Sequence, residues 1–336
     1  WDVGQKPSEM GFDFQYGFYA SHSLYAPEGS EGIVDQRIKR DWTDKFIWSG
    51  QRNGAHAIYR NDMPVDEKGY LTDRIAGEAM NFITAHKDTT FFLFVSFNAP
   101  HTPLQAPETY VNQFSHISNP VKRVYHAMIR NLDDAIGRIM QHLEQSGLDN
   151  STLVFFLSDN GGAEYTQTTD NGPFKGGKIT DFEGGLKVPF IMRWKNRLPA
   201  GHHYHSVVSS LDIFATALAQ TGGEMPAWQQ ADGKDLIPFV SGEVSGNPHP
   251  YLFWQRGFSK AVRSTDWKLM INEDAGDTLL YDMSRTNPFE QRNVSNEFPE
   301  IADQMAAVHQ QWSSTLPEPL WPSMIYYLYR EGNKVY

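Results

Sequence analysis

The chain has 336 residues, which is enough for one large α/β domain with an appendage or for two domains. Its formal net charge of −11 and the lack of any run of Lys and Arg argue against nucleic acid as a partner. The absence of cysteine excludes a disulfide, a thiolate zinc site and a cysteine nucleophile within these residues, and the longest apolar run, FFLFVSF, is far too short to span a membrane.

Regular structure is expected from Thr72 onward, after an ordered, aromatic-rich loop region. Apolar residues at helical spacing predict a first helix that Thr72 caps. The continuous apolar run Phe91–Phe97 predicts a strand that is buried on both faces, as in a parallel sheet. A longer helix is predicted between Asn119, its cap, and Gly147, its end, and another doubly buried strand is predicted at Thr152–Leu157.

Strand, helix and strand in this order form a βαβ unit, in which both strands point the same way. A third apolar run begins at Val188, and SLDIFATALAQTGG predicts a helix that Gly222 ends. The succession predicts an α/β fold, in which helices cover the faces of a sheet.

The composition of the sequence changes after Gly242, in a stretch rich in Gly, Ser and Pro. Four short runs, PYLFWQR, KAVRST, WKLMIN and TLLYDMS, predict a small antiparallel sheet, and a helix is expected at Phe298–Ser313. Prolines in PEPLWP argue against a helix in the tail. We therefore expect an α/β domain at residues 1–243 and a small C-terminal α+β subdomain with a tail at residues 244–336.

Polar side chains follow the two predicted strands of the βαβ unit. Phe91–Phe97 leads into His101, and Thr152–Leu157 leads into Asp159 and Asn160. Ligands bind beyond the carboxyl ends of strands in open α/β sheets, so these side chains are expected at one edge. Carboxylate and carboxamide oxygens favour calcium or magnesium. Taken alone, each piece is better explained as an Asn-Gly turn or a structural histidine.

A third segment, NGPFKGGKITDFEGG, places glycines around Lys175 and Lys178. A lysine on such a loop, beside a divalent cation, is suited to an anionic tetrahedral group. A solvated loop with surface lysines explains this segment equally well when it is considered by itself.

Considered together, FNAPHTPLQAP, TLVFFLSDNGG and GGKITDFEGGLKVPFIMRW resemble segments of the sulfatases of the alkaline-phosphatase superfamily, in the same order. WDVGQKP…GFDFQYGF is similar to the family's GKWHLG…GFD…YGF, and SSLDIFATALAQTG and AVRSTDWKLMIN also resemble sulfatase segments. The resemblance covers nearly the whole chain. It implies an alkaline-phosphatase-like sheet, incomplete at the N-terminus, with a small C-terminal subdomain, and the lineage of a sulfuric-ester hydrolase.

The resemblance also implies roles for individual residues. Asp159 and Asn160 match calcium ligands. His101 matches the histidine that hydrogen-bonds the sulfate ester near its leaving oxygen, and Lys178 matches the lysine that contacts the sulfate; both are expected to be catalytic and to bind substrate. Arg256 is expected to contact substrate from the C-terminal sheet. A cation and fixed donors would stabilise charge on the sulfate oxygens, and an imidazole or ammonium would protonate the leaving oxygen.

Parts of the family's pattern have no counterpart in the sequence. There is no C/S-x-P-x-R motif, from which the family makes its formylglycine nucleophile, and no N-terminal strand with paired metal-binding aspartates. Asp2 replaces a family histidine, and its role is open. Asp159 and Asn160 supply two or three oxygens, whereas Ca²⁺ takes about six to eight. We therefore expect a fragment or one chain of a longer sulfatase, with formylglycine in the missing N-terminal segment. We predict that this chain alone binds calcium weakly and hydrolyses nothing.

Three functions are compatible with these residues. The leading one is hydrolysis of aryl or carbohydrate sulfate esters. The alternatives are a phosphodiesterase or phosphonate hydrolase of the same superfamily and a non-catalytic sulfatase-like protein that binds sulfated glycans. Expected partners are a sulfated small molecule or glycan, and either the N-terminal segment as a separate chain or a second copy. The resemblance to exported bacterial sulfatases implies a periplasmic or secreted location. Candidates for a sugar pocket, each better explained by packing, are Trp48, Arg52, His56 and Trp254.

Overall fold

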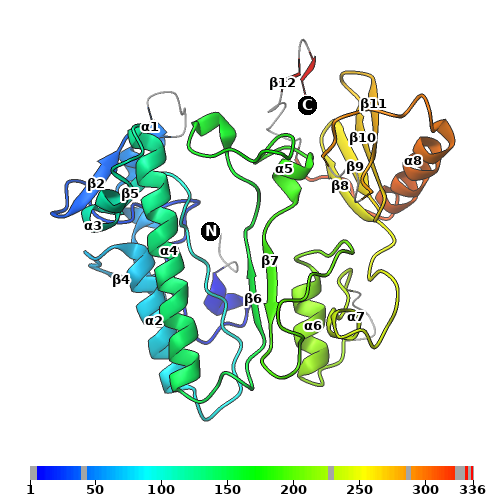
Figure 1. The fold of residues 1–336 in the computed structure, drawn as a ribbon. Coiled ribbons are helices and arrows are strands. Elements are labelled where there is room, and N and C mark those ends of the chain that lie inside the picture. The colour runs from blue at the N-terminus through cyan, green and yellow to red at the C-terminus, as the bar shows by residue number, and fades with distance from the viewer. Residues whose placement is uncertain are drawn as a thin grey trace. The chain divides into compact units, whose positions relative to one another are not determined.

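The structure is a computed structural model, which describes residues 6–38, 44–225, 231–284, 289–321, 330–331 and 334–335. It contains two compact units, whose elements are labelled in Figure 1. Unit 1 comprises Trp1–Ser151 with Tyr165–Thr169, and unit 2 comprises Thr152–Glu164 with Asp170–Tyr336. The domain boundary expected at residue 243 stays a prediction, and Asp2 lies outside the described residues.

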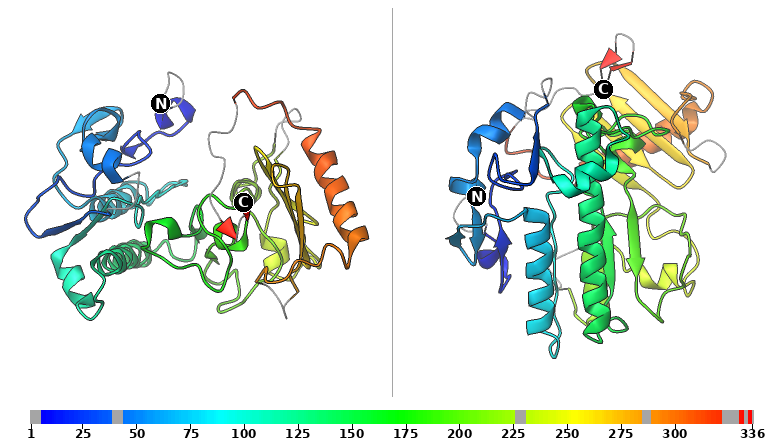
Figure 2. Two further views of the ribbon diagram at one scale, coloured as in Figure 1. Left: turned by 90° about the horizontal axis from the view of Figure 1, so that it is seen from above. Right: turned by 60° about the vertical axis from the view of Figure 1, so that its left-hand side comes forward.

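Two helices of unit 1, α2 (Leu71–Ala85) and α4 (Pro120–Gln145), lie side by side, as Figures 1 and 2 show. Helix α4 begins where the sequence predicts, because the Asn119 side chain accepts hydrogen bonds from two otherwise unpaired N–H groups of its first turn. Gly147 follows the helix in the left-handed region, at φ 74°. Both predicted ends of α4 are therefore confirmed.

The prediction that Thr72 caps the first helix is wrong. Helix α2 begins two residues earlier, with Tyr70 at the cap position, and Thr72 is fully buried inside its first turn. Burial of one helical face against α4 determines where this helix begins, which local sequence does not reveal. The remaining α-helices and strands of unit 1 are β1 (Tyr16–Gly17), β2 (Ile33–Gln36), α1 (Asp44–Gly50), β3 (Ile58–Arg60), β4 (Met63–Val65), β5 (Leu104–Pro107) and α3 (Glu108–Val111).

The predicted doubly buried strand at Phe91–Phe97 is not observed. The segment belongs to no strand of the structure, and its side chains alternate between two environments. Val95 and Phe97 pack against the core of unit 1, whereas Phe92 and Phe94 are 60% and 67% exposed. All strand pairs in the described part of the chain are antiparallel, so the parallel pairing of a βαβ unit is absent from it. The segment therefore has one face covered by the core, and it pairs with no neighbouring strand.

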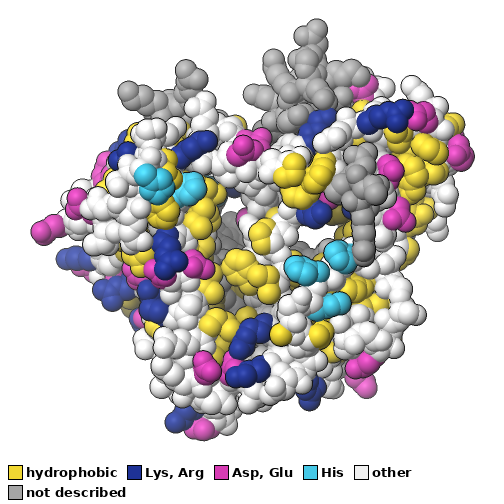
Figure 3. All heavy atoms as spheres, in the orientation of Figure 1, with side chains coloured by type: hydrophobic (Ala, Val, Ile, Leu, Met, Phe, Trp, Pro, Cys, Tyr) yellow, Lys and Arg dark blue, Asp and Glu magenta, His cyan; other side chains and the backbone are white. Residues whose placement is uncertain are grey.

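Unit 2 begins with a two-stranded antiparallel ribbon of β6 (Val154–Leu157) and β7 (Phe190–Arg193). This ribbon contains the second and third predicted apolar runs, but it is not buried on both faces. Phe156 is 39% exposed and Ile191 is 56% exposed. Figure 3 shows hydrophobic side chains among charged ones on the surface it depicts. The other α-helices and strands that precede the C-terminal sheet are α5 (Glu183–Leu186), α6 (Asp212–Gln220) and α7 (Ile237–Val240).

The predicted C-terminal sheet is confirmed. Its antiparallel strands lie in the order β11-β10-β9-β8, and they are β8 (Leu252–Arg256), β9 (Ser259–Arg263), β10 (Trp267–Asn272) and β11 (Asp277–Asp282). Alternating residues point to opposite faces of such a sheet. Leu269 packs on the side of helix α8 (Pro299–Ser313), whereas Met270 packs with Phe182 from the loop before α5. Figure 2 shows α8 along one face of this sheet. The short strands β12 (Arg330–Glu331) and β13 (Lys334–Val335) pair near the C-terminus.

No helix among the described residues is long and apolar enough to cross a membrane. Taken together, the elements give a mixed α/β fold with a small antiparallel sheet and a helix at its C-terminal end.

Candidate functional site

His101 lies in unit 1, on the tight loop that follows the extended segment Phe91–Phe97. The fully buried Tyr25 fixes this loop, because its hydroxyl lies 2.7 Å from Asn98 O and 2.8 Å from His101 O. The His101 N–H also donates to Asn98 O at 2.9 Å. The ring Nδ1 of His101 is 2.7 Å from Thr102 O, and since a carbonyl only accepts, Nδ1 donates. The neutral ring therefore has its unprotonated nitrogen at Nε2.

Two further histidines of unit 1, which the sequence analysis did not connect with His101, lie near it. His22 and His56 have ring centroids 4.4 Å apart. Burial lowers the pKa of His22, and repulsion from His56 and His101 lowers it further, so His22 is neutral near neutral pH. The Nε2 of His22 is buried and has no hydrogen-bond partner among the described residues. Nothing in the spacing of the three histidines along the chain indicated this grouping.

Asp159 and Asn160 lie in unit 2, directly after strand β6. Asp159 is exposed, and its Oδ1 accepts the Asn160 N–H at 2.9 Å. The Asn160 side chain donates through Nδ2 to Gly161 O at 2.8 Å. Its Oδ1 therefore points away from Gly161 O. The chain bends at Asp159 and Asn160, so a carboxylate and a carboxamide follow each other directly after β6.

Residues 175–186, called here the Lys178 loop, are joined to the Asp159–Asn160 segment by backbone hydrogen bonds. Gly161 N–H donates to Gly185 O at 2.9 Å, and Lys178 N–H donates to Gly162 O at 3.0 Å. A side chain on Gly161 has no room, because its Cβ would lie 1.7 Å from Gly184 O. The glycines thus allow two backbone segments to touch, which is the close approach that residues without Cβ permit.

Asn171 joins the same two segments, and the sequence analysis did not identify it. Its side chain accepts from Gly162 N–H at 2.9 Å and donates to Gly162 O at 2.8 Å and to Gly176 O at 3.2 Å. Its own N–H donates to Glu164 Oε1 at 2.8 Å. An asparagine before Gly-Pro is a common turn residue, so this bridging role was not evident from the sequence.

Arg256 lies at the end of β8, opposite Ser259 of β9. The Ser259 hydroxyl donates to the buried Asp181 of the Lys178 loop at 2.5 Å, so this corner of the sheet adjoins that loop. The Nη1 atom of Arg256 is buried without a hydrogen-bond partner in the described structure. A buried guanidinium nitrogen with unused N–H donors is suited to an anionic group.

Packing explains the candidate pocket residues Trp48 and Arg52, as the sequence analysis favoured. Trp48 is 2% exposed, and its indole N–H donates to Asp44. Arg52 donates to several backbone carbonyls, including Leu24 O at 3.0 Å. These two side chains therefore stabilise the loop region of unit 1 and are not available for a ligand.

The residues that the structure describes include no group of three or more His, Cys, Asp and Glu side chains that could hold a metal ion. Asp159 and Asn160 supply the oxygen donors that calcium prefers, but two side chains give fewer oxygens than calcium takes. Asp159, Asn160 and Lys178 lie on two bonded loops of unit 2, with Arg256 on the adjoining sheet, whereas His101 belongs to unit 1. A common cavity for all of them stays a prediction.

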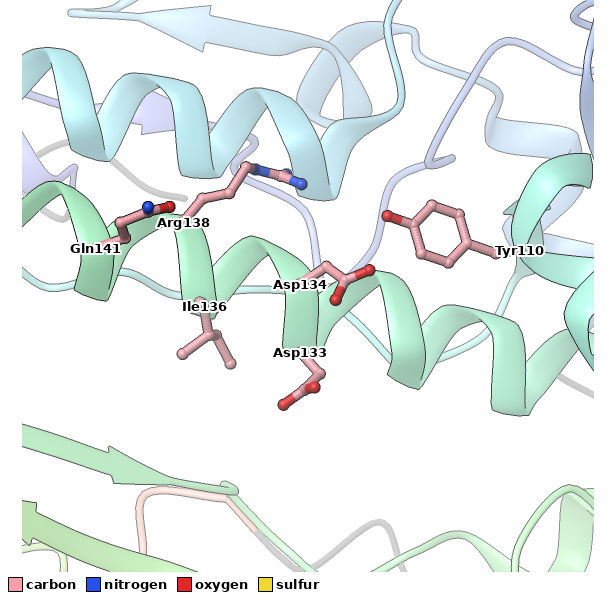
Figure 4. A pocket seen from close by; sticks show the side chains of 7 residues that line it. Tyr110, Asp133, Asp134, Ile136, Arg138 and Gln141 are labelled. Carbon is pink, nitrogen blue, oxygen red and sulfur yellow. The ribbon is translucent and has the colours of Figure 1, made fainter.

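A surface cavity of about 560 Å³ in unit 1 contains none of the candidate residues. Figure 4 shows Asp133, Asp134 and Arg138 on α4, and the Tyr110 hydroxyl points toward the side of the helix that has Asp134 and Arg138. Asp134 accepts a hydrogen bond from Tyr110, and burial together with this bond raises the pKa of that phenol. The carboxylates would repel a sulfate group, so we do not assign the candidate site to this cavity.

A family model described as Sulfatase matches residues 1–223. The uncharacterized sulfatase YdeN of Escherichia coli (strain K12) is 29% identical over 258 residues, which are 76% of this chain and 41% of that protein. The N-acetylgalactosamine-6-sulfatase of Mus musculus is 30% identical over 270 residues, 76% of this chain and 48% of that protein. The chain thus spans less than half the length of these two curated relatives.

Solved structures give the same picture. The crystal structure of Ps i-CgsB in complex with k-i-k-neocarrahexaose superposes with a TM-score of 0.82 at 28% identity, covering 96% of this chain and 71% of that chain. The PsFucS1 sulfatase from Pseudoalteromonas sp. superposes with a TM-score of 0.68 at 23% identity, covering 93% and 68%. The second likeness supports the fold alone.

Proposed function

The chain belongs to the sulfatase family, a lineage of sulfuric-ester hydrolases, and from this membership we propose that it acts on the sulfate esters of carbohydrates with a calcium-assisted site. One observation carries the proposal. The turn with Asp159 and Asn160 and the loop with Lys178 are bound together through Gly161 and Gly162, so hard oxygens and an ammonium group belong to one substructure. A turn and a solvated lysine loop would not need this connection.

Each residue has a role that its chemistry supports. Lys178 holds a sulfate oxygen and stabilises the charge that develops there. For His101 we propose the role of an acid at the leaving oxygen, because an imidazolium can protonate a departing alkoxide. Asp159 and Asn160 are the residues that would bind calcium, which would supply electrostatic stabilisation of the sulfate when bound. We assign no reaction step to the metal, because these two side chains alone do not complete its coordination.

The 336 residues contain no cysteine and no S-x-P-x-R motif. We therefore propose that turnover requires a formylglycine from outside these residues, in the same polypeptide or in a second chain. This absence also favours one alternative, a non-catalytic protein that binds sulfated glycans.

Arg256 indicates the class of substrate. Its buried Nη1, which has no hydrogen-bond partner among the described residues, would bind a second anionic group, such as a neighbouring sulfate or a carboxylate of a sulfated polysaccharide. The solved structure of Ps i-CgsB contains k-i-k-neocarrahexaose, and one curated relative is named an N-acetylgalactosamine-6-sulfatase. A periplasmic or secreted location belongs to the same proposal.

The test uses protein produced from the complete gene and measures sulfate release from a panel of sulfated mono- and polysaccharides, with aryl sulfate and aryl phosphate for comparison. We expect Lys178→Ala to reduce kcat/KM by about 100-fold to 1,000-fold, the usual effect of removing one donor to a developing oxyanion. The matched control is Lys187→Ala, because Lys187 is exposed and its Nζ lies over the ring of Phe174, 4.9 Å from the ring centroid.

Each outcome decides between the functions. Faster hydrolysis of aryl phosphate than of aryl sulfate would favour the phosphodiesterase alternative. Binding of sulfated glycans without turnover would support the non-catalytic alternative. Equal rates for the Lys178 and Lys187 variants would refute the role of Lys178. Turnover by the 336-residue chain alone would refute the need for an external nucleophile.

A further inference from the structure

A lysine is completely buried in the C-terminal sheet. The side chain of Lys268, on β10, has no exposure, and its Nζ lies 3.0 Å from Glu183 Oε1 and 2.8 Å from Glu290 Oε1. Arg263 of β9 adds a second cation, with its Nε 3.4 Å from the same Glu183 oxygen. Two carboxylates and two cations therefore form one closed cluster, called here the Lys268 cluster.

The Lys268 cluster is charged. Burial acts to lower the pKa of Lys268, but Glu183 and Glu290 raise it above its usual value. Burial acts to raise the pKa of Glu183, but Lys268 and Arg263 hold it below its usual value. Burial keeps the pKa of Glu290 raised in spite of Lys268. Desolvation of buried charges offsets much of their mutual attraction, so a buried ion-pair cluster adds little to the free energy of unfolding. Stability therefore does not explain the Lys268 cluster.

The Lys268 cluster fixes Glu183 through two contacts, one to its side chain and one to its backbone. Glu183 is the first residue of α5, in the loop that contains Lys178. Its carboxylate binds Lys268, and its backbone N–H donates to Glu290 Oε2 at 2.9 Å. Two residues further on, Gly185 O accepts the Gly161 N–H of the Asp159–Asn160 turn. The cluster therefore connects the C-terminal sheet to both candidate loops.

The segment between Lys178 and this anchor has little freedom. Thr180 N–H donates to Gly177 O at 3.0 Å, and Gly184 N–H donates to Lys175 O at 2.8 Å. A Cβ at Gly184 would come within 2.3 Å of Gly176 O. A displacement of Glu183 would consequently be transmitted along the loop, since a packed segment of this kind moves as a block.

We propose that the Lys268 cluster positions the Lys178 loop, so that the C-terminal sheet sets how well the site holds a sulfate group. Lys268 is a positioning residue here, which acts through Glu183 and does not touch substrate. The proposal rests on the proposed function for the identity of the anion, but not for the coupling between sheet and loop.

The experiment compares the double variant Lys268→Met/Glu290→Gln with wild-type full-length protein. The double variant removes one charge of each sign, and Gln retains an acceptor for the Glu183 N–H. Two quantities are measured at a temperature where the variant is folded: amide hydrogen exchange over residues 175–186, and the Kd of inorganic sulfate from calorimetry. We expect exchange at least tenfold faster in that segment and a Kd at least tenfold weaker. The single variant Lys268→Arg keeps the charge, so its exchange rate and its Kd for sulfate should lie between those of the wild type and those of the double variant.

The control is His249→Gln. His249 and Asp212 form another buried pair of unit 2, with Nε2 and Oδ1 2.7 Å apart, and no hydrogen bond of that pair leads to the Lys178 loop in the described structure. A general loss of stability would affect both variants alike. Equal changes in exchange over 175–186 in the two variants, or none in the double variant, would overturn the proposal.

The design also separates this proposal from the proposed function. If wild-type protein does not bind sulfate, the sulfate site fails, while the exchange measurement still decides whether the cluster positions the loop. If the double variant does not fold, Ser259→Ala takes its place, because it removes only the hydrogen bond to Asp181 of the same loop. Unchanged exchange and unchanged Kd in Ser259→Ala would then count against positioning by the sheet.

Discussion

Replacement of Gly161 by alanine tests the contact that joins the two candidate loops. The added Cβ would lie 1.7 Å from Gly184 O, 2.8 Å from Gly184 C and 3.1 Å from the Cα of Gly185. Real Cβ atoms essentially never come within 3.0 Å of another heavy atom, and these neighbours are backbone atoms, so the loops must separate by more than an ångström. That movement also breaks the hydrogen bond from Gly161 N–H to Gly185 O.

The expected cost follows from these two effects. Overpacking costs about 1–3 kcal/mol, and a lost hydrogen bond adds about 1 kcal/mol, so Gly161→Ala should lower the free energy of unfolding by about 2–4 kcal/mol. Displacement of Lys178 by an ångström should also weaken the catalytic or binding function about 100-fold. Urea denaturation followed by circular dichroism measures the first effect, and the assays described above measure the second.

The control is Gly77→Ala in helix α2, where a Cβ meets nothing within 4 Å. Alanine is favoured over glycine in a helix, so this change should stabilise the protein by about 0.5–1 kcal/mol. A Gly161→Ala protein whose free energy of unfolding equals that of wild type would refute the reasoning. It would mean that the two loops are not in contact in solution.

Three further predictions concern single side chains. Tyr25→Phe removes the hydroxyl that fixes the His101 loop and should cost about 1–3 kcal/mol, measured by denaturation, with a lower kcat and an almost unchanged KM; wild-type values would argue against this support. Asn119→Ala removes the cap of α4 and should cost about 1 kcal/mol without affecting sulfate binding, as thermal unfolding and calorimetry would show. Burial raises the pKa of Glu183, but Lys268 lowers it overall. Its contribution is therefore present above the usual carboxyl pKa of 4.5 and is lost as the pH falls through the lower folded value. The stability difference between wild type and Glu183→Gln should shrink on acidification below pH 4.5, and a constant difference would contradict this.

Much of the fold could be predicted because local signals and tertiary structure agree. The four strands of the C-terminal sheet alternate between two packed faces, and the cap at Asn119 and the glycine at 147 define α4. The prediction failed at Phe91–Phe97, where a continuous apolar run suggested burial on both faces. Only Val95 and Phe97 reach the core of unit 1, because burial depends on what covers each face. An apolar run reports that a segment can be buried, not that a neighbouring strand is present.

The sequence alone determined the chemistry of the candidate site: the oxygens of Asp159 and Asn160, the ammonium of Lys178 on a glycine-rich loop, and membership of a family through motifs in a fixed order. Only the tertiary structure decided how these groups are held. It placed Gly161 against Gly184, and it buried Lys268 against Glu183, 85 residues away along the chain. The physical reason is that the loops are joined mainly by backbone hydrogen bonds, whose donors and acceptors are the same in nearly every residue. Side-chain identity cannot indicate which of them will meet until the chain has folded.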